Sequence, residues 1–340
     1  MFLTLVGRFV DGQIKGKRPW TNVYGAARSL LAVGTLLTLA CNRSATLFIT
    51  GSGMNFDPPD SQYFIQKIGF FCVFGPHHLE MARWVAVALL AVVASGWNPR
   101  LTGLIHWWIA SSLQMSATLV DGGDAITANL TLLMLPLTLT DPRRSHWGSA
   151  DVKDSHPSAR LRLFFALIGY VLIRFQMAGV YFHASVAKFG VEEWADGTAI
   201  YYWAINPTFG YPDWLQPLTM RLLKDPVIVC CTTWGVMILE YLLGIGLFLP
   251  KRHWKWLLYG GITLHVGIII LHGLVSFGLA MIAGLILYLR PLEQVFHFGR
   301  KSGEGAFSAT AGKLRIAGAD RTEEAEGDQV PNGALNEQGK

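Results

Sequence analysis

One stretch decides the fold: Arg174-Phe-Gln-Met-Ala-Gly-Val-Tyr-Phe-His-Ala-Ser-Val-Ala-Lys188, followed by Phe-Gly-Val-Glu-Glu-Trp194 and Ala-Asp196. The apolar part is typical of a helix that crosses a bilayer, and it ends on a lysine, two glutamates, an aspartate and a tryptophan. Ionisable groups at the mouth of a membrane helix are costly and tend to mark function. The stretch therefore predicts a membrane span with a candidate site at its end.

Composition extends this interpretation to the whole chain. Of the 340 residues, 51% are hydrophobic and only 15% are charged, whereas a soluble domain carries about a quarter charged residues. The formal net charge of +5 comes from basic residues in short loops, a pattern typical of helix orientation in a membrane. We therefore expect the lipid bilayer as a partner, and no nucleic acid.

Eight apolar windows have about the length of a membrane span, namely 24–41, 81–96, 101–119, 124–140, 161–187, 227–249, 255–272 and 274–290. The apolar piece 65–75 is too short to cross and predicts an interfacial or re-entrant helix. The sequence thus predicts an all-α, polytopic membrane helix bundle of about eight transmembrane helices.

Basic residues orient this bundle. With eight spans, the following lysines and arginines fall on one face: Arg8, Lys15, Lys17, Arg18, Arg100, Arg143, Arg144, Lys153, Arg160, Arg162, Lys251, Arg252, Lys255, Arg290, Arg300 and Lys301. The positive-inside rule makes that face cytoplasmic, so both termini are predicted to be cytoplasmic. The predicted domains are a cytoplasmic segment at 1–23, a transmembrane domain at 24–295 and a polar, disordered cytoplasmic tail at 296–340.

The same topology brings distant polar residues to the extracytoplasmic face. Lys188 is the strongest candidate for a catalytic residue. Loss of solvation among apolar groups favours the neutral amine, which acts as a base or a nucleophile. Alternatively, Lys188 extends to the interface as an ordinary helix end. The acids Glu192, Glu193 and Asp196 either set the state of the lysine or are solvated loop charges.

Two aspartates in the turn Asp121-Gly-Gly-Asp124 lie on that face as well. Both are candidates for holding a cation or positioning a substrate. Alternatively, Asp124 is the N-cap of the fourth span, which we favour, and Asp121 is then the remaining candidate.

Deeper in the spans, Glu240 needs a partner, because a carboxylate at mid-membrane costs about 3 kcal/mol on insertion scales. His265 on the neighbouring helix or Arg174 is the expected partner. His265 and His272 share a helical face, but seven residues span about 10 Å, too far for one ion. We therefore expect a hydrogen-bonded pair or proton relay, and no metal site.

The four cysteines do not form a disulfide framework. Cys41 and Cys72 fall on the extracytoplasmic side, where a disulfide and two unpaired, buried thiols both remain open. Cys230 and Cys231 are expected to be packing residues.

The residues also resemble a known superfamily. Tyr181-Phe-His-Ala-Ser-Val-Ala-Lys188…Trp194-Ala-Asp-Gly197 resembles the Tyr-Phe-x-Ala-Gly-x-x-Lys-Leu…Trp-x-x-Gly segment of the vitamin K-dependent gamma-carboxylase-like, or horizontally transferred transmembrane (HTTM), domain. Within that superfamily the chain is most similar to the sporulation-delaying protein B family. The similar blocks are His106-Trp-Trp-Ile-Ala-Ser-Ser, Val120-Asp-Gly-Gly-Asp124, Leu139-Thr-Asp-Pro-Arg-Arg and Glu192-Glu-Trp-Ala-Asp-Gly-Thr-Ala-Ile-Tyr-Tyr-Trp203.

The resemblance implies a bacterial inner-membrane protein that acts with a second maturation protein on a secreted antimicrobial peptide precursor. It implies that Lys188 is a base towards a reduced quinone, such as menaquinol or vitamin K hydroquinone, on the extracytoplasmic side. The other candidate catalytic residues are Asp121, Glu240 and His265. The candidate substrate-binding residues are Asp124, His183, Trp194, Asp196 and Arg174.

The chain departs from the carboxylase pattern. Ala187-Lys188 stands in place of a lysine pair, one extra residue separates Lys188 from Trp194, and the large lumenal domain is missing, which argues against gamma-carboxylation itself. Three functions remain open: peptide maturation through Lys188, a non-enzymatic export or immunity partner of the peptide, and a membrane enzyme acting on lipid or quinone.

Overall fold

The computed structural model describes residues 18–48, 67–118, 120–148 and 157–296. Within these ranges the chain is helical, and the only β contact is one isolated bridge between Trp97 and Ser145. The predicted all-α class is thereby confirmed. All of the described residues except Phe296 lie in one compact unit, which spans Met1–Val295. The tail predicted at 296–340 lies almost wholly outside them, as do residues 1–17 of the predicted N-terminal segment.

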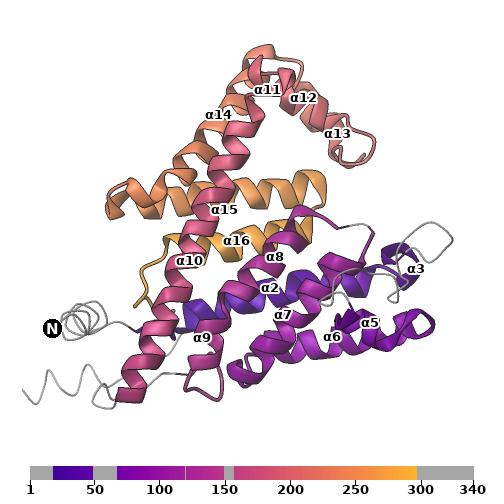
Figure 1. Ribbon diagram of the computed structural model, residues 1–340. Helices are drawn as coiled ribbons and strands as arrows, with labels where there is room; N and C mark the ends of the chain where they lie inside the picture. Colours follow the sequence, from indigo (N-terminus) through magenta and orange to yellow (C-terminus); the bar gives the residue numbers. More distant parts are fainter. Residues whose placement is uncertain (1–17, 49–66, 119, 149–156, 297–340) are drawn as a thin grey trace, which may run out of the picture. The chain divides into compact units, whose positions relative to one another are not determined.

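The longer helices (Figure 1) are α2 (Asn22–Cys41), α6 (Leu79–Ser95), α7 (Pro99–Ser116), α8 (Gly122–Leu133), α10 (Pro157–Lys188), α14 (Pro226–Gly244), α15 (Trp254–His272) and α16 (Val275–Leu289). The shorter ones are α3 (Ser44–Leu47), α5 (Phe70–Phe74), α9 (Leu135–Thr140), α11 (Glu192–Ala195), α12 (Ala199–Ala204) and α13 (Gln216–Leu222). Single 3₁₀ turns occupy Pro76–His78, Gly246–Phe248 and Lys251–His253. Each of the eight predicted spans overlaps a helix.

Five helical segments among the described residues are long and apolar enough to cross a membrane: Asn22–Cys41, Pro76–Ser95, Ser158–Lys188, Pro226–Gly244 and Lys251–His272. The other three predicted spans correspond to α7, to α8 with α9, and to α16, which are shorter or less apolar. The chain is therefore a helical membrane protein. The count of eight spans and the side of the termini stay predictions.

The predicted span 124–140 is broken in the structure. Helix α8 ends at Leu133 and α9 begins at Leu135, with Pro136 in its first turn. Proline has no N–H to donate within a helix, and it disfavours the helical conformation of the residue before it. The prediction of one continuous helix was wrong at this point.

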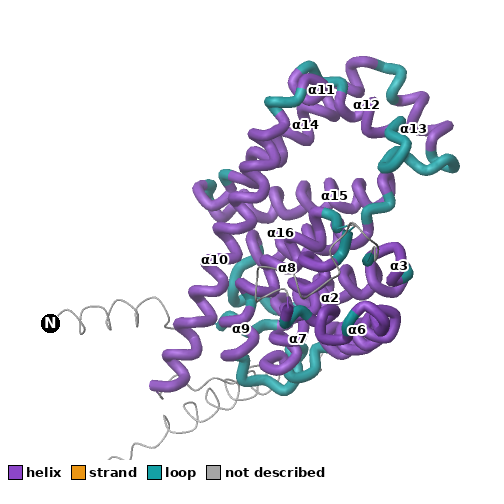
Figure 2. Tube along the Cα trace, turned by 45° about the vertical axis from the view of Figure 1, so that its right-hand side comes forward, coloured by secondary structure: helices purple, strands orange, loops and turns teal. Residues whose placement is uncertain are grey.

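Helix α16 lies at the centre of the bundle. It packs against α2, α8, α10 and α15. The ribbon in Figure 1 and the tube in Figure 2 both show this placement. Most of its side chains are buried, which explains why its sequence is apolar on all sides. Small residues permit close packing: a Cβ at Gly284 would lie 2.6 Å from Met177 of α10.

The segment between α10 and α14 carries α11, α12 and α13 (top of Figure 1). A small apolar cluster joins it to α14, made of Ala204, Tyr211, Leu223 and Val229. His272, at the end of α15, donates from Nδ1 to the Phe209 carbonyl oxygen at 2.6 Å. This segment is therefore fastened to the ends of two long helices.

The predicted interfacial helix at 65–75 is present as α5, although residues 65 and 66 lie outside the described ranges. All four cysteines are free thiols in the structure. Cys72 is half-buried and Cys41 is exposed, so the expectation of two buried thiols was wrong for Cys41. Cys230 and Cys231 are also exposed. The Cys230 sulfur nevertheless packs against Gly197, where a Cβ would lie 2.9 Å from it.

Candidate functional site

An ion pair joins the end of α10 to α14. Lys188 Nζ lies 2.7 Å from Glu240 Oε2, with the two side chains 21% and 12% exposed. The same ammonium group donates to the Ala184 carbonyl oxygen at 3.3 Å and lies 4.9 Å from the centre of the Trp194 ring. Glu240 thus has the partner that a membrane-embedded carboxylate requires. That partner is Lys188, so the expectation of His265 or Arg174 was wrong.

The pair is positioned by the close antiparallel packing of α10 and α14. Gly244 permits this approach, because a Cβ there would lie 2.7 Å from the backbone of Phe182. One turn further along α10, the buried hydroxyl of Ser185 donates to the Met237 carbonyl oxygen at 3.1 Å. These two contacts fix the register that brings Lys188 to Glu240.

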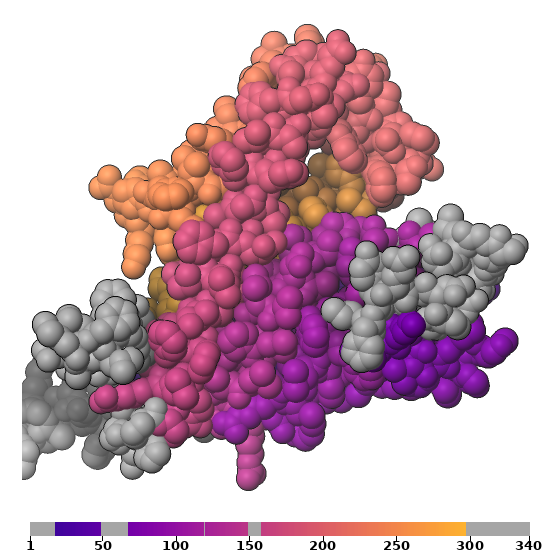
Figure 3. Space-filling model, in the orientation of Figure 1, coloured from indigo at the N-terminus to yellow at the C-terminus, as the bar shows by residue number. Residues whose placement is uncertain are grey.

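The ion pair faces a cavity of about 810 Å³. Its walls are mostly apolar and come from α8, α10, α15 and α16, and its ionisable lining residues are Tyr181, His183, Lys188, Glu240 and His265. In the space-filling view the surface is hollowed beside α10, where atoms of the last two helices are seen behind it (Figure 3). Ligand pockets typically combine apolar walls with a few polar groups in this size range.

Tyr181 and His265 form a second polar pair in this cavity. The Tyr181 hydroxyl lies 2.8 Å from His265 Nε2, both side chains are buried, and Phe277 packs its ring 5.6 Å from that of His265. Tyr181 was missing from the candidate residues. Its spacing of seven from Lys188 is the signal that could have found it, because two helical turns place both on one face.

The two aspartates of the turn before α8 differ from their expected roles. Asp121 is the N-cap of α8 and accepts from the Asp124 backbone N–H at 2.9 Å, while Asp124 accepts from the Asp121 N–H at 3.3 Å. This is a capping box, so the prediction of Asp124 as N-cap was wrong. Asp121 also accepts from the Ser276 hydroxyl at 3.0 Å, which ties the starts of α8 and α16 together. Neither aspartate lines the cavity around Lys188.

The remaining candidates are distributed unevenly. His183 is exposed and lines the cavity. Arg174 precedes Lys188 by fourteen positions, about 21 Å along the helix, and lines a different cavity. The structure does not bring Arg174 to Lys188 and Glu240.

The acidic residues after α10 do not face the lysine. Asp196 accepts from both the backbone N–H and the hydroxyl of Thr198, at 2.9 and 2.6 Å, and so stabilises a local turn. Glu192 and Glu193 are exposed in the first turn of α11. Of this group of candidates, only Trp194 contacts Lys188.

Comparison with known proteins gives the chain a family. It is 36% identical over 289 residues to the sporulation-delaying protein SdpB of Bacillus subtilis strain 168, covering 84% of this chain and 86% of SdpB. The chain belongs to the SdpB family. It is also 38% identical over 284 residues to the uncharacterized protein YitO of the same bacterium, covering 83% of this chain and 89% of YitO. No family model and no solved structure matches, so the wider HTTM resemblance stays a prediction.

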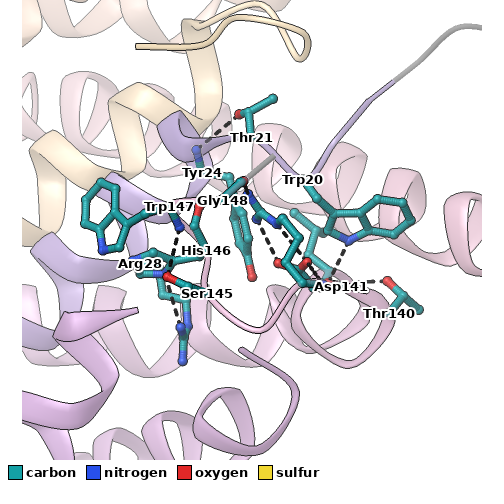
Figure 4. Close-up of polar contacts among 12 residues, drawn as sticks. Trp20, Thr21, Tyr24, Arg28, Thr140, Asp141, Ser145, His146, Trp147 and Gly148 are labelled. Carbon is teal, nitrogen blue, oxygen red and sulfur yellow. Dashed lines mark hydrogen bonds and ion pairs between the residues drawn. The ribbon is translucent and has the colours of Figure 1, made fainter. Parts of the chain in front are cut away.

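This SdpB-family chain has a second polar cluster, after α9, that sequence reasoning missed (Figure 4). We call Arg28, Asp141, Arg143 and His146 the His146 cluster. The Arg143 guanidinium binds Asp141 through two bonds of 2.9 and 2.8 Å, and both side chains are buried. It also donates to the His146 carbonyl oxygen at 2.8 Å. From the sequence, Arg143 was interpreted only as one of the basic residues that orient the helices. Its partner Asp141 is two residues away, a spacing that does not place two side chains on one face of a helix.

The His146 ring is held on both nitrogens. Arg28 Nη1 donates to Nδ1 at 3.2 Å, so Nε2 carries the hydrogen and lies 3.2 Å from the Ser29 hydroxyl. A Cβ at Gly96, which has φ +88°, would overlap the ring. Burial, followed by the positive charges of Arg28 and Arg143, lowers the pKa of His146 to about 3.

Proposed function

We propose that this chain is a multi-pass protein of the bacterial inner membrane that is needed to produce or mature a secreted, sporulation-delaying-type peptide. The identity with SdpB over most of both chains supports the link to such a peptide. The cavity that exposes the Lys188–Glu240 pair carries the mechanistic part of the proposal. The site opens to the extracytoplasmic side, and a second maturation protein completes recognition of the precursor.

Proton exchange is the chemistry that this geometry supports. Lys188 and Glu240 share a hydrogen bond of 2.7 Å, so a proton can pass from the ammonium group to the carboxylate. Lys188 is then a neutral amine within a largely apolar cavity, where it can accept a proton from a bound ligand. The Tyr181–His265 pair lines the same cavity and orients the ligand through hydrogen bonds.

A reduced quinone fits the cavity by its chemistry. Apolar walls match a ring and an isoprenoid tail, while Lys188, Tyr181 and His183 offer polar contacts to hydroxyl groups. When bound, such a quinol supplies electrons and an acidic hydroxyl for chemistry on another molecule. The chain's own contribution is to bind the quinol, to exclude water and to hold its proton at Lys188 Nζ.

A second candidate function follows from the completeness of the ion pair. A lysine that is already bonded to Glu240 ties α10 to α14 as a structural link. In that case the chain is a non-enzymatic export or immunity partner, and the cavity holds part of the peptide without changing it.

Mass spectrometry of secreted peptides separates the two candidates. The test compares cells that carry wild type, a deletion, Lys188→Met and, as a matched control, Lys224→Met, an exposed lysine that does not line the cavity. Chemistry at Lys188 predicts a peptide form that is lost in the deletion and in Lys188→Met but kept in Lys224→Met. The mass difference would identify the reaction.

The charge-reversed pair Lys188→Glu with Glu240→Lys gives an independent readout. It keeps an ion pair between α10 and α14 but moves the amine to the other helix. Restored peptide output in this double variant would support the structural link and contradict a reaction at Lys188. Membrane levels of every variant are measured by immunoblot, so that loss of protein is not counted as loss of function.

A further inference from the structure

A second cavity lies further along α10, away from Lys188. It has a volume of about 790 Å³ and is lined by α10, by the start of α15 and by residues directly after α16. Its lining shares only Leu172 with the cavity around Lys188. The two cavities are therefore distinct sites, and the function proposed above leaves this one without a role.

Positive charge dominates the polar part of this lining. Among the described residues that line it, the cations are Arg174, Lys251, Lys255 and Arg290, and the only acid is Glu293. Long apolar side chains form the rest of the wall, among them Phe164, Leu167, Ile168 and Leu258. A cavity that pairs excess cations with an apolar wall fits an amphiphile with an anionic head.

Arg174 is built into the wall of this cavity. Its Nη2 donates to the Arg290 carbonyl oxygen at 3.1 Å, and its guanidinium lies 5.1 Å from the centre of the Trp254 ring. These two contacts hold the positively charged guanidinium at the edge of the cavity, where it adds to the charge of the lining.

The start of α15 has the features of a membrane interface. Lys251 and Lys255 are exposed there, beside the exposed aromatic rings of Trp256 and Tyr259. Lys255 Nζ lies 5.0 Å from the centre of the Trp256 ring. Basic and aromatic residues gather where a helix leaves the hydrocarbon, and the basic end is predicted to be cytoplasmic.

We propose that this second cavity is a binding site for an anionic phospholipid. The phosphate lies among Arg174, Lys251 and Lys255, and the acyl chains cover the apolar side chains of α10 and α15. Basic pockets between helices on the cytoplasmic side suit such headgroups. A zwitterionic lipid carries a cation that these side chains repel, and a soluble phosphate leaves the apolar wall uncovered.

Native mass spectrometry of the full-length protein in detergent tests the site, with dioleoyl phosphatidylglycerol and dioleoyl phosphatidylcholine as probes. Phosphatidylglycerol is expected to bind more tightly. Lys255→Gln and Arg174→Gln are each expected to lower its affinity by about fivefold, because one cation near a headgroup contributes about 1 kcal/mol. Arg252→Gln is the matched control, since Arg252 is exposed in the same turn but does not line the cavity.

Three results would overturn the proposal. One is equal binding of the two lipids, and another is an equal loss of affinity in Arg252→Gln and Lys255→Gln. The third is displacement of the lipid by glycerol phosphate at equal concentration, which would indicate a soluble phosphate ligand. If Arg174→Gln fails to accumulate in the membrane, the test rests on Lys255→Gln, which changes an exposed side chain and should not disturb folding.

Discussion

Around His146, two arginines, an aspartate and a histidine bond to one another and to backbone carbonyls, and they line neither of the two cavities described above. Around Lys188, one lysine and one glutamate share a single bond of 2.7 Å beside a cavity of about 810 Å³. Both clusters hold opposite charges between helices or loops. They differ in what surrounds those charges.

Under the function proposed above, the difference separates a structural from a functional use of charge. In the His146 cluster, protein groups bind Asp141, Arg143 and His146 on several sides, and these bonds fix the path of the chain after α9. Lys188 has one strong partner, Glu240, and lies at the wall of a cavity. Loss of a charge should therefore destabilise the first cluster and impair function at the second.

The largest expected effect is at Arg143. Arg143→Met leaves Asp141 as a buried, unpaired carboxylate, which costs about 3–5 kcal/mol of unfolding free energy. Thermal unfolding in detergent and membrane levels measure the loss. Arg144→Met is the matched control because Arg144 is exposed, and its unfolding midpoint should hardly change. If the two variants were equally stable, that result would contradict the structural role of the His146 cluster.

Lys188→Met should have a smaller effect on stability, about 1.5–3 kcal/mol for one charge-assisted hydrogen bond. The cavity lets solvent or a proton relieve Glu240, unlike Asp141. The double variant Lys188→Met with Glu240→Gln should recover part of the loss, measured as the unfolding midpoint. If Lys188→Met destabilised the protein as strongly as Arg143→Met, the contrast between the two clusters would fail.

Acid should weaken the His146 cluster. The folded pKa of about 3 lies below the usual value of 6.5, so the unfolded chain binds a proton that the folded chain rejects. Stability is therefore unaffected above about pH 6.5 and falls below it. From pH 6.5 to 5.0 the loss is about 1.6 kcal/mol, and well below pH 6.5 the slope approaches about 1.4 kcal/mol per pH unit. His146→Gln should lack this part of the pH dependence, and an unchanged slope in that variant would contradict the assignment.

Trp194→Leu should have the smallest effect. It removes the ring from beside Lys188 Nζ, where an exposed cation–π contact contributes about 0.5–1 kcal/mol. Trp194→Phe should keep part of that contribution, and Trp214→Leu, which changes an exposed tryptophan elsewhere between α10 and α14, is the control. Unfolding midpoints rank the three variants. If Trp214→Leu lowered the unfolding midpoint as much as Trp194→Leu, the loss would come from removing a large ring and not from removing the cation–π contact.

The helices could be predicted better than their polar contacts. Apolar windows located all eight long segments, because burial in lipid and burial in protein both favour unbroken apolar runs. Pro136 broke one of them, and its position in the sequence was a visible warning. The capping box of α8 has Asp121, not Asp124, at the N-cap, and the sequence could not decide between them because aspartate suits both positions.

The partner of Glu240 could not be read from the sequence. It depends on the register between α10 and α14, which Gly244 and Ser185 set through contacts across helices. Arg28 and Arg83 show the same limit: each is buried within an apolar helix and bonded to groups distant in sequence. A one-dimensional pattern shows that a charge is embedded, but it does not show which group neutralises it.

The central position of α16 has a consequence for biogenesis. This helix is the last one in the described chain, yet α2, α8, α10 and α15 all pack against it. During synthesis, the earlier helices enter the membrane before the segment that fills their common centre exists. The packing at the centre of the bundle can therefore be completed only after residues 275–289 have been made, so truncation before them should leave that centre unfilled.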